Sequence, residues 1–249
     1  MDPANLNKIE RTVINTRTRY VEFWKNRKRH AELIKKAREN SVAKHGARET
    51  LKRKRIAGGL YKFRALDRAG VWGRSFNAGL KELSTYWYNL DLVSEIMERA
   101  ITSDGDYHVL EVGCGGGKAA SELYANLKGK VRVSALGLAR IPEWAGYPNC
   151  KKIGWHVGDV AKLSRMKAFP AGSVDFIHSN IGIGHSPEIY KSLQQVHKVL
   201  KRGGRIIFTY DGNEEIKIPN GFKFVKGFPR GYKKNPLYAQ LKTYYFEKV

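Results

Sequence analysis

Four residues at alternating positions could form a ligand-binding turn: Glu111, Gly113, Gly115 and Gly117. Glu111 lies within a short apolar run, and the three glycines come directly after that run. This pattern predicts a buried strand that leads into a tight turn and then into a helix over residues 118–127. Glycines permit a positive φ and let a ligand approach the backbone closely. The N–H groups at the start of the following helix attract an anionic or polar ligand.

Two common nucleotide-binding motifs do not fit this turn. A phosphate-binding P-loop requires Gly-x-x-x-x-Gly-Lys-Ser/Thr, but Val112 stands at its first glycine and Ala119 at its Ser/Thr. The dinucleotide motif Gly-x-Gly-x-x-Gly needs its third glycine where Lys118 stands. An ordinary strand-to-helix turn is the alternative without a ligand, and the small residue Cys114 suits either interpretation.

The composition indicates a polyanionic partner. The 249 residues include 46 Lys and Arg against 23 Asp and Glu, a net charge of +23. Such an excess most often serves nucleic-acid binding inside cells. A membrane is the less favoured partner, because the sequence contains no long apolar run. Two cysteines, Cys114 and Cys150, are too few for a disulfide framework or a metal cluster. No apolar signal segment opens the chain, so we expect a cytoplasmic protein, with the nucleus also open.

The charge is spread unevenly and divides the chain into three parts. Residues 1–68 carry 20 basic and 7 acidic residues, residues 69–103 carry 3 and 4, and residues 104–249 carry 23 and 12. We therefore expect a basic helical arm, a helical connector and a moderately basic α/β domain. Within the connector, apolar residues at helical spacing predict one helix over residues 80–100.

The arm, residues 1–68, has two open interpretations. Its Lys and Arg side chains could clamp the phosphates of a nucleic acid while its aromatic residues stack on bases. Alternatively, it could be a solvated helical cap whose aromatic stripe packs on the main domain. The basic run Lys52–Arg55 could be a nuclear address or a loop at a helix end. The net charge of the arm exceeds what solubility requires, which favours the clamp.

Further strands follow in the order of a doubly wound α/β fold. A seven-stranded, mostly parallel sheet flanked by helices is expected, in which ligands bind at the carboxyl ends of the strands. The last two strands should form an antiparallel pair. After the first strand, the expected strands are residues 130–138, 153–157, 172–179, 205–210, 222–227 and 241–248, with a helix over 189–200 and a turn over 201–204.

The ordered motifs resemble those of class I S-adenosylmethionine-dependent methyltransferases, with motifs like those of methyltransferase type 11. The resemblance rests on the acidic-x-Gly-x-Gly-x-Gly turn, on Gly158-Asp159-Val160 and on the segment 199–205, and it covers about residues 104–210. It implies a Rossmann-like fold and S-adenosyl-L-methionine as the cofactor. The family transfers a methyl group by in-line displacement from the sulfonium, so the enzyme's main work is positioning.

The resemblance also implies which residues bind the cofactor. Asp159 would accept the adenine amino group beside the backbone N–H of Val160, although an Asp at this position could simply cap the next helix. Ser179 and Asn180 would lie beside the methionine moiety. The full implied set is Glu111, Gly113, Cys114, Gly115, Gly117, Gly137, Leu138, Asp159, Val160, Ser179 and Asn180, with no metal ligand.

Gly137 departs from the family's pattern. Its position, at the end of the second strand, usually holds a carboxylate that chelates the ribose hydroxyls. Glu143 lies six residues later, in a Pro-Glu-Trp loop. Losing a charged hydrogen-bond acceptor typically costs ~1.5–3 kcal/mol, so we expect cofactor binding in the micromolar range or weaker.

The loop after the fourth strand and the distribution of charge indicate which kind of molecule accepts the methyl group. The loop Ser179-Asn180-Ile181-Gly182 is neither the Asn-Pro-Pro-Tyr of amino-nitrogen methylases nor a Pro-Cys nucleophile. His185 is a candidate base, although the family often has a histidine here without a catalytic duty. The basic arm and the basic tail from Lys217 favour methylation of RNA such as rRNA or tRNA. The alternatives are a small-molecule or protein methyltransferase, or a degenerate fold that serves as an RNA-binding assembly factor.

Overall fold

The structure is a computed structural model that describes residues 78–249, apart from residues 104, 128, 181, 211–214 and 226–241. The predictions for the arm, residues 1–68, lie outside the described residues. None of the described helices is long and apolar enough to cross a membrane.

Seven strands form one sheet in the order β3-β2-β1-β4-β5-β7-β6. The five strands from β3 to β5 run parallel, while β7 pairs antiparallel with both β5 and β6. This arrangement confirms the predicted fold class and the antiparallel end pair. The strands are β1 (Tyr107–Val112), β2 (Val131–Gly137), β3 (Gly154–Val157), β4 (Val174–Ser179), β5 (Leu200–Tyr210), β6 (Phe222–Phe224) and β7 (Lys242–Lys248).

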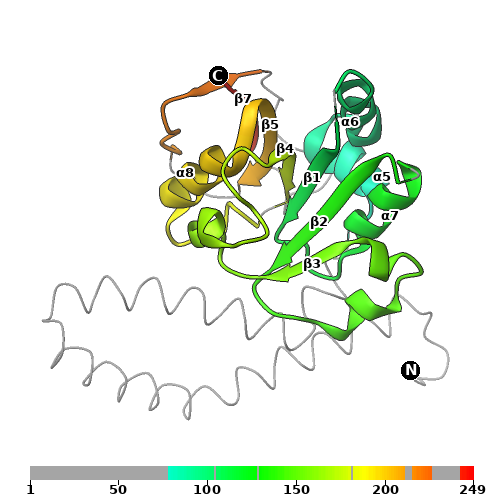
Figure 1. Ribbon diagram of the computed structural model, residues 1–249. Coiled ribbons are helices and arrows are strands. Elements are labelled where there is room, and N and C mark those ends of the chain that lie inside the picture. Colours follow the sequence, from blue (N-terminus) through cyan, green and yellow to red (C-terminus); the bar gives the residue numbers. More distant parts are fainter. Residues whose placement is uncertain (1–77, 104, 128, 181, 211–214, 226–241) are drawn as a thin grey trace, which may run out of the picture.

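Helices cover both faces of the sheet (Figure 1). One face packs against α5 (Leu80–Glu82), the π-helix η2 (Leu83–Tyr88), α6 (Leu92–Ile101) and α7 (Lys118–Asn126). The other packs against α8 (Ile189–Val199) and the 3₁₀ helix η5 (Val160–Arg165). Two further 3₁₀ turns, η3 (Pro142–Gly146) and η4 (Cys150–Lys152), connect β2 to β3. Because both faces are covered, every residue of β1 and β4 is buried.

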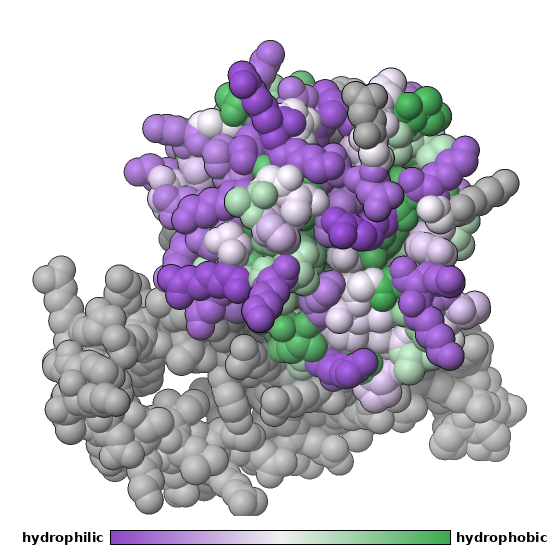
Figure 2. Space-filling model, viewed as in Figure 1, coloured by the Kyte–Doolittle hydropathy of each residue, from purple (hydrophilic) through white to green (hydrophobic). Residues whose placement is uncertain are grey.

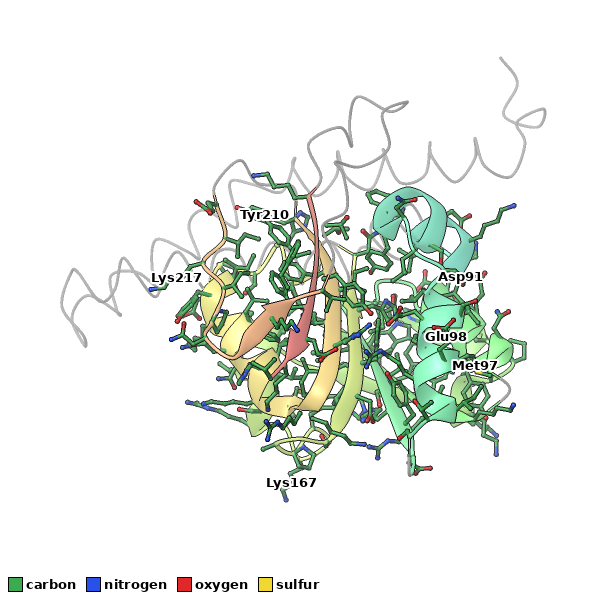
Figure 3. All side chains as sticks on the ribbon, turned by 90° about the horizontal axis from the view of Figure 1, so that it is seen from above. Asp91, Met97, Glu98, Lys167, Tyr210 and Lys217 are labelled. Carbon is green, nitrogen blue, oxygen red and sulfur yellow. The ribbon has the colours of Figure 1, made fainter. Side chains whose placement is uncertain are left out.

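The prediction of one helix over residues 80–100 is wrong. The helix is interrupted between η2 and α6, where Asn89 adopts a left-handed conformation with φ of 48°. Asp91 then caps α6, since its Oδ1 accepts the backbone N–H groups of Val93 and Ser94 at 3.1 and 3.2 Å. Figure 3 shows Asp91 at the start of α6, with Met97 and Glu98 further along that helix.

The predicted turn over residues 201–204 lies inside β5 instead of before it. The register with β4 jumps from Val174 opposite Leu200 to Phe176 opposite Arg205. The intervening residues therefore bulge out of the ladder, and Gly203 in this bulge has φ of 74°. The strand begins earlier than predicted because pairing resumes on both sides of the bulge.

Candidate active site

The carboxyl ends of four parallel strands meet at one edge of the sheet. Val112 of β1 is level with Leu136 of β2, Gly137 of β2 is level with Val157 of β3, and Glu111 is level with His178 of β4. Residues that immediately follow these strands are therefore neighbours in space. The predicted cofactor-binding residues lie at the ends of these strands or in the turns that follow them: Glu111, Gly113, Cys114, Gly115, Gly117, Gly137, Leu138, Asp159, Val160, Ser179 and Asn180.

The glycine turn between β1 and α7 leaves no room for a side chain at Gly113 or Gly117. Gly113, Gly115 and Gly117 have φ of 77°, 48° and 81°, which is the left-handed region that favours glycine. A Cβ atom at Gly113 would lie 2.5 Å from Cα of Gly182, in the loop after β4. The backbone N–H of Gly113 donates to the carbonyl of Leu136 at 2.8 Å. The turn is thus fixed against both neighbouring strand ends.

Ser179 and Asn180 hold the loop after β4 in place. The Ser179 hydroxyl donates to the carbonyl of Val112 at 2.8 Å and accepts the backbone N–H of Ile183 at 2.8 Å. The Asn180 Oδ1 accepts the hydroxyl of Thr209 at 2.9 Å. These bonds position the loop against the glycine turn. A direct contact of either residue with the methionine moiety stays a prediction.

Asp159 and Val160 follow β3 and begin η5. The Asp159 Oδ1 accepts the backbone N–H of Ala161 at 2.9 Å, so the alternative interpretation of this residue as a helix cap is confirmed. Its predicted contact with adenine is compatible with the cap, because a carboxylate has further acceptor positions. Val160 is buried and Leu138 is half-buried. His185 lies half-buried in the loop after β4, and its role as a base stays a prediction.

A buried polar cluster beneath the glycine turn was missed by the sequence interpretation. It consists of Tyr88, Glu111 and His178, and Tyr88 and His178 are fully buried with their rings edge to face at 6.4 Å. Among the described residues, the Tyr88 hydroxyl, the Glu111 Oε2 and both His178 ring nitrogens have no hydrogen-bond partner. The sequence contains one indication of it, a histidine inside the apolar strand β4. Its register opposite Glu111 is visible only in the structure.

Burial controls the charge of this cluster. Loss of hydration raises the pKa of Glu111 to about 8, although the backbone N–H of Ala120 opposes the shift. Burial lowers the pKa of His178 to about 3, so its ring is neutral. Burial and the nearby Glu111 carboxylate raise the pKa of Tyr88. Near neutral pH the cluster therefore carries little charge until a cation approaches Glu111.

The residues fit S-adenosylmethionine at one end of the site and depart from the family at the other. The turn offers a bare glycine backbone. The Glu111 Oε2, which has no hydrogen-bond partner within the described part of the chain, is a carboxylate oxygen suited to a cationic ligand. When bound, the cofactor supplies a methyl group on a positively charged sulfur. At the end of β2, Gly137 offers no side chain to the ribose. No group of three or more potential metal ligands occurs among the described residues.

A search of solved structures finds partial similarity to this chain at low sequence identity. A SAM-dependent methyltransferase from Aquifex aeolicus is 16% identical, with a TM-score of 0.48, over 72% of this chain and 98% of that one. The 1,6-didemethyltoxoflavin-N1-methyltransferase from Burkholderia thailandensis is 16% identical, with a TM-score of 0.46, over 63% and 76%. The [4+2]-cyclase SpnF is 19% identical, with a TM-score of 0.38, over 48% of this chain and only 44% of its own length.

Sequence comparison assigns the central part of the chain to a family. A search of curated protein sequences gives no match. Residues 110–208, however, match the sequence profile of a family described as a methyltransferase domain. This segment runs from β1 to β5 and contains the glycine turn and all the strand ends of the site. Together with the seven-stranded sheet order, the match shows that the chain contains a methyltransferase domain of the S-adenosylmethionine-dependent class.

Proposed function

We propose that this chain is an active methyltransferase that transfers a methyl group from S-adenosylmethionine to RNA. The observation that carries the proposal is the net charge of +23 of the whole chain, in which a methyltransferase domain is joined to a basic extension. A polyanionic acceptor explains this charge better than a small neutral one, because each phosphate contact made by Lys or Arg releases counterions. Structured RNA such as rRNA or tRNA is the acceptor class we propose.

Cations beside the carboxyl edge of the sheet support an RNA acceptor. Arg140 follows β2, while Lys162 and Arg165 belong to η5, which follows β3. All three are exposed, and none forms an ion pair within the part of the chain that the structure describes. Hydrophilic side chains also dominate the face that Figure 2 shows. Phosphates could thus be held close to the strand ends.

The chain's own contribution to such a reaction is positioning. The fixed glycine turn and the loop tied by Ser179 define where the donor and the acceptor lie relative to each other. Because the methyl group is already activated, correct placement can supply much of the rate enhancement. No dedicated acid or base is required for the proposal.

Transfer of radiolabelled methyl groups tests the proposal. In three separate reactions, the full chain is incubated with labelled S-adenosylmethionine and one acceptor mixture: total RNA, protein extract or small-molecule extract. We expect label in RNA, and loss of that label in Gly113→Ala, whose added methyl group collides with Gly182. The matched control is Gly172→Ala: Gly172 also has a positive φ, but no atom of the described residues lies within 4 Å of the added Cβ.

A small-molecule acceptor is the second candidate. The Burkholderia thailandensis structure is described as a methyltransferase of 1,6-didemethyltoxoflavin, a small molecule. Label that enters only the small-molecule extract would establish this candidate and reject RNA as the acceptor. Cofactor binding without transfer to any of the three extracts would favour an RNA-binding assembly factor.

A further inference from the structure

Trp144 fills the space beside the glycine that departs from the family pattern. This residue belongs to η3, in the loop after β2, and only 3% of its surface is exposed. Its Nε1–H donates to the carbonyl of Gly115 at 2.9 Å. The indole thus joins the end of β2 to the glycine turn that follows β1.

The tryptophan excludes a side chain at Gly137. A Cβ atom at this position would lie 2.9 Å from Cζ2 and 3.2 Å from Cη2 of Trp144. Real Cβ atoms essentially never approach another atom within 3.0 Å. Gly137 is not among the residues with a positive φ, so its backbone conformation does not require glycine. The glycine is therefore needed by the neighbouring ring.

Aromatic stacking fixes the position of this ring. Trp144 stacks on Trp155 of β3, with ring centroids 5.1 Å apart and an interplanar angle of 16°. Trp155 stacks in turn on Tyr147 at 6.4 Å and donates its Nε1–H to the carbonyl of Cys150 at 2.9 Å. Stacked aromatic pairs gain energy beyond the area that they bury. Trp144 is therefore a built wall, held by a hydrogen bond on one edge and a ring on one face.

We propose that Trp144 replaces the ribose carboxylate as a specificity-determining residue of the methyl-donor site. The donor's adenosyl group meets an indole where the family presents a charged acceptor. The site therefore does not recognise the two ribose hydroxyls through a charged acceptor. It binds methyl donors, and the products left after transfer, even when they lack one of these hydroxyls. This inference rests on the cofactor class of the domain and is independent of the methyl acceptor.

Calorimetric binding of S-adenosylhomocysteine and of its 2′-deoxy and 3′-deoxy forms tests the proposal without catalysis. A charged acceptor on a hydroxyl is typically worth about ten- to a hundredfold in affinity. In the wild-type chain we expect each deoxy compound to bind within about threefold of the parent, because neither Gly137 nor Trp144 offers a charged acceptor to the ribose at the end of β2. A loss of tenfold or more for either compound would overturn the proposal.

Paired variants separate the tryptophan from the glycine. Gly137→Asp alone should weaken binding of all three compounds, since its Cβ meets Trp144. In the double variant Trp144→Gly, Gly137→Asp the carboxylate has room, and the hydroxyls should then matter by about tenfold or more. Trp144→Gly alone should show no such discrimination. Thermal melting of each variant verifies folding, and the wild-type ratio stands even if a variant does not fold.

Two further outcomes would contradict the proposal. Glu143 adjoins Trp144 in η3, so discrimination in the wild-type chain that disappears in Glu143→Gln would make Glu143 the ribose acceptor. Binding by Trp144→Gly but not by the wild-type chain would make Trp144 a plug. If neither the wild-type chain nor Trp144→Gly binds S-adenosylhomocysteine at millimolar concentration, the proposal that Trp144 lines the adenosyl site is also rejected. None of these results depends on whether RNA is methylated.

Discussion

Gly113 and Gly172 have the same backbone requirement but different surroundings. Both have a positive φ, and only Gly113 has another backbone within 3 Å of an added Cβ. We expect Gly172→Ala to lower the free energy of unfolding by about 1 kcal/mol through backbone strain. Gly113→Ala should cost at least about 2 kcal/mol, because overpacking adds to that strain. It should also abolish calorimetric binding of S-adenosylhomocysteine, and equal effects of the two variants would contradict this explanation.

The buried Glu111 should make the free protein less stable as the pH rises. Its ordinary pKa of 4.5 is raised to about 8 in the folded chain. Between these values the unfolded chain has released the proton and the folded chain retains it, so the free energy of unfolding falls with increasing pH. Glu111→Gln cannot ionise and should be more stable than the wild type at pH 8, on the order of a few kcal/mol.

Urea denaturation of the free protein at pH 5, 6.5 and 8 measures this effect. The difference between Glu111→Gln and the wild-type chain should grow across the series. The control is Glu98→Gln on the exposed side of α6 (Figure 3), for which the difference should stay constant. A Glu111→Gln curve parallel to that of the wild type would mean that the carboxylate is hydrated or paired.

At the scale of elements, the start of α6 depends on one side chain. Asp91 accepts two backbone N–H groups and the Ser94 hydroxyl, the latter at 2.8 Å. Asp91→Ala should lower the free energy of unfolding by about 1 kcal/mol. Asp91→Asn should remain close to the wild type, since asparagine is an equally good cap. If both variants lose the same amount in thermal or chemical denaturation, the charge rather than the cap is what stabilises this end.

The elements that could be predicted from the sequence are those set by local patterns. The apolar runs of β1 and β4 and the glycine turn each lie within a few neighbouring residues, so their order predicted the sheet and the strand ends at which the candidate site lies. The break before α6 was missed because the helical spacing of apolar residues continues across Asn89 and Asp91, where the helix is interrupted. Trp144 above Gly137 could not be predicted, because that contact depends on how the loop after β2 folds back.

At the scale of the whole molecule, the basic arm should contribute to RNA affinity through phosphate contacts. Each neutralised phosphate on a single strand changes the slope of log affinity against log salt by about −0.7. Replacing all four residues of Lys52–Arg55 by glutamine should therefore make the slope shallower by up to about 3. Binding of S-adenosylhomocysteine should not change. An unaltered salt slope would indicate that this run does not contact RNA.

Hydrogen exchange across the full chain, with and without millimolar S-adenosylhomocysteine, tests most directly whether the carboxyl edge of the sheet is the donor site. Amides that close around a ligand exchange more slowly. We predict slower exchange in four separate segments that meet only in the folded structure: residues 111–118, 137–144, 159–161 and 179–180. Exchange in β6, at the far edge of the sheet, should be unchanged. Protection centred elsewhere, or none at saturating ligand, would contradict the assignment of this edge as the methyl-donor site.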